Sequence, residues 1–345
     1  MPMVQQALRT IKTIKKILLV LLGIGIVIAG YFLIGKAPQQ NHINWGVTFS
    51  QKHATNLGLD WKETYVALLQ DLQIKHLRLI AYWDLVEPEP GVYKFEDLDW
   101  QVKNARMNNA GVTLVMGMRV PRWPECHVPD WAKGLSKEQQ QEKILDLLKA
   151  AVLHFRHVPT IKYWQVENEP FFAFGECPWS DRSFLKKEID LVRSLDNLHR
   201  PIIETESGEW SPWTLAAQYG DIVGVTMYRK AYFSQFHGYL VYPLTPVFYW
   251  RKAQIIQKFF HREVIPVEVQ AEPWGPKLLY DTSVEEQQKT MNPEQFKNTV
   301  EFAKRTGFKE FYLWGGEWWY WMKVKQNDSR IWDQAKSLFR DSLSP

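Results

Sequence analysis

Residues 161–170 read IKYWQVENEP, and this stretch decides the fold. Its first six residues are rich in β-branched and aromatic side chains, which favour a buried strand. The strand runs without a spacer into two carboxylates and an amide at residues 167–169, and Pro170 then ends it because proline has no amide hydrogen to donate. Charged groups at the tip of an apolar strand are costly unless they lie at an open mouth where they act. The stretch therefore predicts a strand whose carboxyl end carries functional groups.

The same alternation of strands and helices continues through the chain beyond residue 43. We expect strands at residues 44–50, 76–81, 111–118, 161–167, 201–206, 222–228, 265–272 and 308–314. We expect helices at residues 61–73, 97–109, 136–155, 180–195, 213–218, 249–260, 293–306 and 330–343. Eight such units with near-continuous apolar strands predict a (β/α)8 TIM barrel of the α/β class. A doubly wound open sheet is the alternative, but residues 46–54 (GVTFSQKHA) provide no glycine-rich phosphate turn.

An uncharged run of 19 residues, ILLVLLGIGIVIAGYFLIG, occupies residues 17–35. At about 1.5 Å per residue, a helix of this length crosses the apolar core of a membrane. Four basic residues precede the run and one follows, so we expect a cytoplasmic N-terminus. A cleaved signal peptide is the alternative, but its apolar region is usually about 7–15 residues long. The predicted order is a basic cytoplasmic segment at 1–16, a single-pass transmembrane anchor at 17–35, a tether at 36–43 and an extracytoplasmic barrel at 44–345.

The charge of the chain argues against a nucleic-acid partner. The formal net charge is +4, but residues 1–36 hold five basic residues and no acid, which leaves −1 on the remainder. A near-neutral body has no basic stripe for a phosphate backbone.

Seventeen tryptophans indicate either an aromatic-rich core or flat apolar surfaces for a ligand. The oligomeric state is not predicted.

Carboxylates, arginines, tyrosines and tryptophans recur where the predicted strands end, whereas histidines do not. The nine histidines form no HxH or HExxH pattern, so we expect no metal and no cofactor. Paired carboxylates beside aromatic residues suit the cleavage of a glycosidic bond, in which one acid protonates the leaving oxygen and a second carboxylate meets the anomeric carbon. Glu169 after strand four and Glu272 after strand seven are the predicted pair.

Strand seven carries a second glutamate, and the side-chain alternation of a strand ranks the two. Glu268 and Glu272 should both face the barrel axis, with Val267, Val269 and Ala271 against the outer helices. Glu272 is then nearer the mouth, and Glu268 lies deeper, where it fits a buried polar network. We therefore expect Glu272 to be the reacting group.

Two motifs resemble the clan A glycoside hydrolases, a (β/α)8 group of cellulase-, mannanase-, xylanase- and β-galactosidase-like enzymes. The first is WQVENEP at residues 164–170, with the Gln-x-Glu-Asn-Glu form of the β-galactosidase branches. The second is HLRLIAYWDLVEPEPGVYKFEDLD at residues 76–99. The resemblance extends from about residue 44 to residue 314 and implies a retaining double displacement on a β-linked oligo- or polysaccharide.

The resemblance also implies roles for single residues. Glu169 would be the acid/base and Glu272 the nucleophile. Asn168 would bind the sugar 2-hydroxyl, and Arg78 would hold Glu272 ionised. The remaining implied substrate-binding residues are Tyr228, beside the nucleophile; Trp314, the floor under the reacting sugar; and Arg119, which stands where such enzymes usually have a histidine that His127 could replace.

Several side chains near the predicted mouth have two interpretations. Trp83, Trp123, Trp274, Trp318 and Trp319 could stack on sugars or pack at the rim. Cys126 and Cys177 follow neighbouring strands, so an exported chain would bring them within reach of a disulfide, with two free thiols as the alternative.

Two alternative functions remain for the whole chain. They are a non-catalytic carbohydrate-binding barrel and a transglycosylase that remodels a cell-surface glycan.

Overall fold

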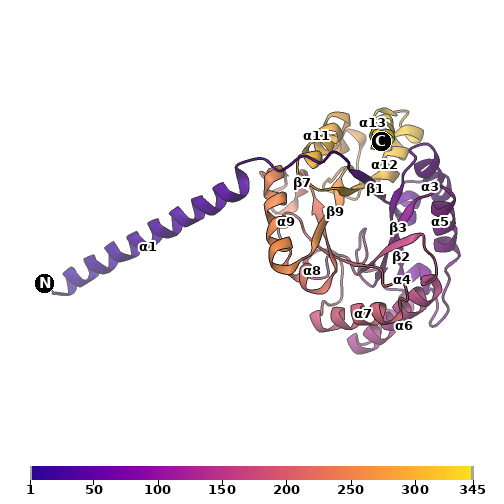
Figure 1. Ribbon diagram of the computed structural model, residues 1–345, viewed down its shortest axis with the longest axis horizontal. Coiled ribbons are helices and arrows are strands. Elements are labelled where there is room, and N and C mark those ends of the chain that lie inside the picture. The colour runs from indigo at the N-terminus through magenta and orange to yellow at the C-terminus, as the bar shows by residue number, and fades with distance from the viewer. Residues whose placement is uncertain (1, 343–345) are drawn as a thin grey trace.

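The computed structural model describes residues 2–342, apart from the side chains of residues 2–4 and 7–10. One residue of the predicted cytoplasmic segment (residue 1) and residues 343–345 of the predicted barrel domain lie outside the described residues. Helix α1 (Pro2–Leu33) extends away from a rounded barrel domain, as Figure 1 shows. Its segment Ile11–Leu33 is long and apolar enough to cross a membrane.

Eight parallel strands close into a barrel in the order β1-β10-β9-β6-β5-β4-β3-β2, which confirms the predicted fold. The strands are β1 (Asn44–Thr48), β2 (His76–Tyr82), β3 (Gly111–Gly117), β4 (Ile161–Val166), β5 (Ile202–Glu206), β6 (Ile222–Met227), β9 (Glu263–Gln270) and β10 (Glu310–Trp314). Their outward residues join the helices in the main apolar core, and a smaller cluster that includes Ile203, Ile265 and Tyr312 fills the barrel axis. The barrel is therefore a packed core with its functional surface at one end.

The eight predicted helices are all present and surround the strands (Figure 1). They are α3 (Trp61–Gln70), α5 (Glu96–Met107), α6 (Lys137–Phe155), α7 (Arg182–Leu195), α8 (Thr214–Tyr219), α9 (Pro246–Phe260), α11 (Pro293–Lys304) and α13 (Arg330–Ser342). Their starts follow capping chemistry: the Ser136 and Gln139 side chains form a reciprocal capping box at α6, and Asn292 caps α11.

Additional short elements lie in the loops and were not expected from the sequence. They are α2 (Gln51–Asn56), α4 (Trp83–Val86), α10 (Val284–Gln287), α12 (Gly316–Lys325), the 3-10 turns Asp130–Ala132, Ser234–Phe236 and Leu279–Asp281, and the hairpin of β7 (Lys230–Phe233) and β8 (Gly238–Val241). The hairpin follows β6 and leads directly into α9.

The C-terminal end of α1 packs on the start of α9. The Thr245 hydroxyl donates to the Leu33 carbonyl (3.1 Å), and the Phe32 and Phe248 ring centres are 5.9 Å apart. The chain then runs to β1 along the domain, where the Gln40 side chain donates to the Gly307 carbonyl (2.9 Å). The segment between α1 and the barrel is thus in contact with the domain along its length.

Candidate active site

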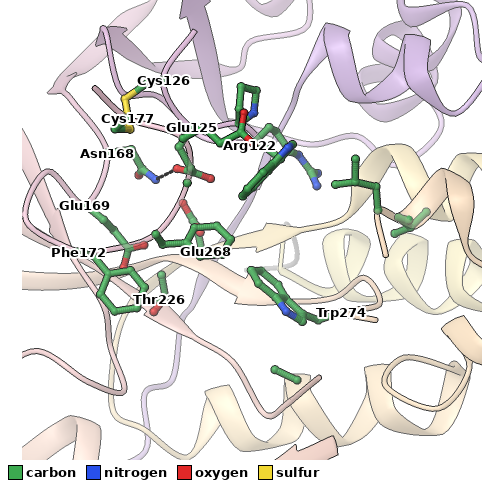
Figure 2. A pocket seen from close by; sticks show the side chains of 18 of the residues that line it. Arg122, Glu125, Cys126, Asn168, Glu169, Phe172, Cys177, Thr226, Glu268 and Trp274 are labelled. Atoms are coloured by element: carbon green, nitrogen blue, oxygen red, sulfur yellow. Dashed lines mark hydrogen bonds between the residues drawn. A yellow bond between two sulfur atoms is a disulfide. The ribbon is translucent and has the colours of Figure 1, made fainter. Parts of the chain in front are cut away.

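A pocket of about 1500 Å³ opens at the carboxyl ends of the barrel strands. The loops after β3, β4, β5, β6 and β9 form most of its wall, and Trp314 at the end of β10 also lines it. Figure 2 shows side chains from the loops after β3, β4 and β9 and from strands β6 and β9 around the pocket. Ligands bind at this end of the strands in (β/α)8 barrels, so the pocket is the candidate active site.

The two glutamates after β4 have different surroundings. The carboxylate oxygens of Glu167 accept hydrogen bonds from the backbone amides of Met118 (2.8 Å) and Arg119 (2.7 Å). Glu169 lines the pocket, and among the described residues its Oε1 has no hydrogen-bond partner. Positive φ angles of 61° and 43° at the two residues make the sharp turn that directs their side chains apart. Glu167 therefore fixes the neighbouring loop, and Glu169 is available to a ligand.

Arg78 on β2 connects three buried polar groups beneath the pocket. It is fully buried, and its guanidinium donates to Gln165 (2.8 Å), to Asn168 (2.7 Å) and to Glu268 (2.9 Å). The prediction that Arg78 holds Glu272 was wrong, because the carboxylate that it pairs with is Glu268. One cation thus links the residue before Glu169 to a glutamate on the opposite side of the barrel.

A β-bulge in β9 changes the expected alternation of this strand. β6 pairs Val225 with Pro266 and then Thr226 with Glu268, so Val267 is an extra residue. Val267 packs in the cluster inside the barrel, contrary to the prediction that it faces the helices. Because a bulge interrupts the strict alternation of a strand, Glu268 also faces inward and lines the pocket. Glu268 thus belongs to a buried polar network around Arg78, as expected, but it also lines the pocket.

Three carboxyl groups gather in this part of the pocket. Figure 2 shows Glu169, Glu268 and Glu125 close to one another, and Glu125 accepts a hydrogen bond from the Asn168 amide (3.4 Å). Burial, followed by the nearby charges of Glu268 and Glu125, raises the pKa of Glu169 well above its usual range. These effects favour the protonated form of Glu169, while Glu268 has a cationic partner in Arg78.

Glu272 belongs to a second charged cluster, past the end of β9. Arg122 pairs with Glu272 and, at 3.2 Å, with Glu317, and His53 Nε2 lies 3.4 Å from Oε2 of Glu272. Burial alone would raise the pKa of Glu272, but Arg122 and His53 lower it to about 2. The Arg122 guanidinium carbon also lies 4.0 Å from the ring centre of Trp314, so it covers one face of the ring predicted to support a sugar.

Aromatic side chains form much of the remaining wall. Tyr228 and Trp274 line the pocket, with ring centres 5.2 Å apart. The ring centre of Phe174 lies 5.7 Å from that of Trp274 and 5.8 Å from that of Trp123. Trp123 is 44% exposed. These rings offer flat faces of the kind on which sugars stack.

Besides Arg78, which lies beneath the pocket, two more of the predicted binding residues do not line it. Trp83 is fully buried because it begins the short helix α4, and its indole nitrogen donates to Glu87 (2.8 Å). Arg119 is buried beside the pocket, and its guanidinium donates to the carbonyl of Phe174 (2.7 Å). Both side chains therefore support loops, and the prediction that they contact a ligand was wrong. Trp318 and Trp319 are also fully buried.

Sequence reasoning missed Arg122, Glu125, His53 and Glu209, all of which line the pocket. They lie in loops or in the short helix α2, where no hydrophobic period indicates the direction of a side chain. The only available signal was their position within a few residues of a strand end. The predicted His127 also lines the pocket, and burial lowers its pKa to about 3.

A disulfide joins Cys126 and Cys177, as expected, and connects the loops after β3 and β4. It stands next to Glu125, whose backbone has a φ of 73°. Gly175 lies against the same residue, because a Cβ on Gly175 would come within 2.7 Å of Glu125. The disulfide and the glycine together hold the Glu125 carboxyl in the pocket wall.

Removing this disulfide is expected to reduce both stability and activity. The bridge closes a loop of 51 residues, for which chain entropy gives a stabilisation of up to about 4 kcal/mol. A Cys126→Ser, Cys177→Ser double variant should lose about 2–4 kcal/mol of unfolding free energy in urea titration. The wild type in reductant should show the same loss, and equal midpoints with and without reductant would contradict the prediction.

A scan against protein-family models finds no match, and no curated protein matches the chain significantly. Solved structures do match. GH5_18 from Streptomyces cattleya, in complex with GlcNAc, is 13% identical over 80% of this chain and 71% of its own, with a TM-score of 0.55. Xylanase 10B from Thermotoga petrophila, in complex with xylobiose, is 18% identical over 79% of this chain and 82% of its own, with a TM-score of 0.54.

A β-galactosidase from Rahnella sp. is also similar, with 13% identity, a TM-score of 0.54, and coverage of 89% of this chain and 57% of its own. At these identities the comparisons establish the barrel fold. They agree at that level with the resemblance drawn from the sequence motifs.

Proposed function

We propose that the chain is a retaining glycoside hydrolase of β-linked oligo- or polysaccharides, with Glu169 as acid/base and Glu268 as nucleophile. The observation that carries the proposal is the placement of these two carboxyl groups in one pocket, where the environment of the first raises its pKa and the second is paired with Arg78. A carboxylic acid and a carboxylate in such a pocket match the two groups that glycosidic cleavage requires. The likeness in fold to xylanase and β-galactosidase structures supports the same activity.

The proposed reaction has two steps. Glu268 attacks the anomeric carbon while the Glu169 carboxyl gives its proton to the departing glycosidic oxygen. Glu169, now ionised, takes a proton from water as that water displaces Glu268 from the sugar. Arg78 stabilises negative charge on Glu268 before attack and again when it leaves. Tyr228 lies beside the same carboxylate, where its hydroxyl orients the nucleophile.

Glu268 replaces Glu272 in this assignment because of their partners. Arg78 binds Glu268 and also Asn168, the residue adjacent to Glu169. The charge of Glu268 acts directly on Glu169, whereas Glu272 is engaged by Arg122 and His53. We assign Glu272, Arg122 and His53 to binding of the substrate next to the reacting centre, and Trp274 and Trp123 to stacking on further sugars.

Turnover of a panel of aryl β-glycosides by the full chain in detergent tests the function. Proton NMR of the first product should show the β anomer, which is the outcome of double displacement. A first-formed α anomer would contradict the retaining mechanism. Binding of glycans without turnover would favour the carbohydrate-binding barrel, and transfer to a sugar acceptor in preference to water would favour the transglycosylase.

We further propose that α1 anchors the enzyme in a cell membrane, with the barrel outside. The apolar segment, the basic residues before it and the disulfide in the barrel support this topology. The full chain should sediment with membranes after an alkaline carbonate wash, and a variant that begins at residue 37 should be soluble. Recovery of the full chain in the soluble fraction, or N-terminal sequencing that reveals cleavage after residue 35, would contradict the anchor.

A further inference from the structure

Glu125 is a buried carboxyl group in the pocket wall that the proposed reaction does not use. Glu125 is 7% exposed, and its backbone has a left-handed (positive φ) conformation. The adjoining disulfide and Gly175 hold the backbone in that conformation. Among the described residues, no lysine, arginine or histidine is ion-paired with it, and its hydrogen bond from Asn168 is long at 3.4 Å. A buried charge without a counter-ion is costly, so a ligand that supplies the counter-ion would bind there favourably.

The nearby cations are already engaged with other groups. Arg78 pairs with Glu268 and donates to Gln165 and Asn168, and the Arg119 guanidinium donates to the Phe174 carbonyl. Burial and the charge of Glu268 raise the pKa of Glu125 to about 7, against the opposing effect of Arg119. Beside this group, Oε1 of the buried Glu169 also has no partner among the described residues. This part of the pocket therefore has more carboxyl groups than cations.

The position of Glu125 determines which part of a sugar it would meet. In the proposed reaction the anomeric carbon lies between Glu169 and Glu268. The ring atoms bonded to that carbon are C2 and the ring oxygen, and only C2 carries a substituent. Glu125 adjoins Glu268 in Figure 2 and accepts a hydrogen bond from Asn168, the residue next to Glu169. A sugar held between Glu169 and Glu268 would therefore bring its C2 substituent toward Glu125.

We propose that Glu125 binds a protonated amine on C2, and that the preferred substrates are β-linked 2-amino-2-deoxyhexosides of the glucosamine type with a free amine. This inference rests on the proposed function for the placement of the sugar. An ammonium group supplies the missing positive charge and three donors, and the carboxyl groups of Glu125 and Glu268 both face it. An N-acetyl group is neutral and larger and lacks that charge, and a hydroxyl group offers a single donor.

Three substrates that differ only at C2 test the proposal: an aryl β-D-glucosaminide, the β-D-glucoside and the N-acetyl-β-D-glucosaminide. The full-length wild type at pH 7.5 should favour the glucosaminide over the glucoside by at least about tenfold in kcat/KM, in line with a buried charge pair. Glu125→Gln keeps the size of the side chain and removes its charge, so this preference should fall at least about tenfold. Glu142→Gln, at an exposed glutamate of α6 that does not line the pocket, is the matched control and should leave the preference unchanged.

The preference should also depend on pH in a way that a purely structural role would not produce. Below pH 7 Glu125 becomes protonated and neutral, so the wild-type preference should decline as the pH falls, and Glu125→Gln should lack this decline. Equal wild-type rates on glucosaminide and glucoside, or a preference that survives in Glu125→Gln, would overturn the proposal.

A binding measurement separates this site from the proposed reaction. Calorimetry with Glu268→Gln protein should give tighter binding of a glucosamine tetramer than of a cello-tetraose, and the additional Glu125→Gln substitution should remove the difference. If the wild type cleaves no aryl glycoside at all, the proposed function fails, but the ratio of the two affinities still decides the amine site. Equal affinities would contradict it.

Discussion

Glu268→Gln is expected to lower kcat/KM by at least about 10⁴-fold, equivalent to about 5.5 kcal/mol of transition-state stabilisation. Glutamine fills the same space, but it cannot form the glycosyl ester on which the second step depends. Glu272→Gln should lower kcat/KM only about 10–100-fold, mainly through KM, because it removes contacts to the substrate and leaves the nucleophile in place. Steady-state kinetics on one aryl β-glycoside compare the two variants directly.

A small nucleophile distinguishes loss of chemistry from loss of structure. In Glu268→Ala the vacated space admits azide, which should restore turnover of an activated aryl glycoside and yield the α-glycosyl azide by a single displacement. Glu268→Gln leaves the buried Arg78 without its ion pair, a change that commonly costs about 3–5 kcal/mol. Circular dichroism and thermal unfolding must therefore show that each variant is folded. If azide rescues Glu272→Ala and not Glu268→Ala, the nucleophile is Glu272.

Glu169→Gln is expected to cause a loss that depends on the leaving group. For substrates with alkyl or sugar leaving groups, which need a proton to depart, kcat/KM should fall about 10³–10⁴-fold, at the upper end of general acid catalysis. For a dinitrophenyl leaving group, which departs without a proton, the same variant should lose less than about tenfold in kcat/KM. A loss of equal size across all leaving groups would contradict the assignment.

The same residue should set the alkaline limb of the pH profile. Because the pKa of Glu169 is raised, its acid form persists to higher pH than that of an ordinary carboxyl group and disappears as the pH rises through that pKa. Wild-type kcat/KM on an alkyl glycoside should therefore fall on the alkaline side, and Glu169→Gln with the dinitrophenyl substrate should show no such fall. An unchanged alkaline limb in the variant would assign it to another group.

The barrel and one of its two carboxyl groups were predictable from local patterns. Strand and helix periods repeat eight times, and the Glu-Asn-Glu-Pro sequence at the end of β4 places charge where a strand must stop. The choice between the two glutamates of β9 was not predictable in the same way, because alternation directs both Glu268 and Glu272 inward and only the folded chain pairs Arg78 with Glu268. The extra residue at Val267, which directs one more side chain into the barrel, arises from the pairing with β6.

The loops account for the other differences between expectation and structure. Arg122 and Glu125 lie in a stretch without periodicity, and their directions depend on the disulfide and on neighbouring loops. Trp83 was misassigned because the chain enters a short helix directly after β2 and turns that ring into the core. The hairpin of β7 and β8 was predictable in principle. Aromatic residues, which favour strands, lie on both sides of the His237-Gly238 turn.

The contact between α1 and α9 has a consequence for where the proposed membrane-anchored enzyme would work. The Arg251 guanidinium carbon lies 4.5 Å from the ring centre of Tyr31 at the end of α1, and the Gln40 side chain donates to the Gly307 carbonyl, so the short connection between α1 and β1 is tied to the domain at two places. With α1 in a bilayer, the domain would lie directly on the lipid surface. A long flexible linker would instead let the domain move far from the membrane. Its working distance would be about one domain diameter, which suits glycans attached to the cell envelope better than polymers dissolved in the medium.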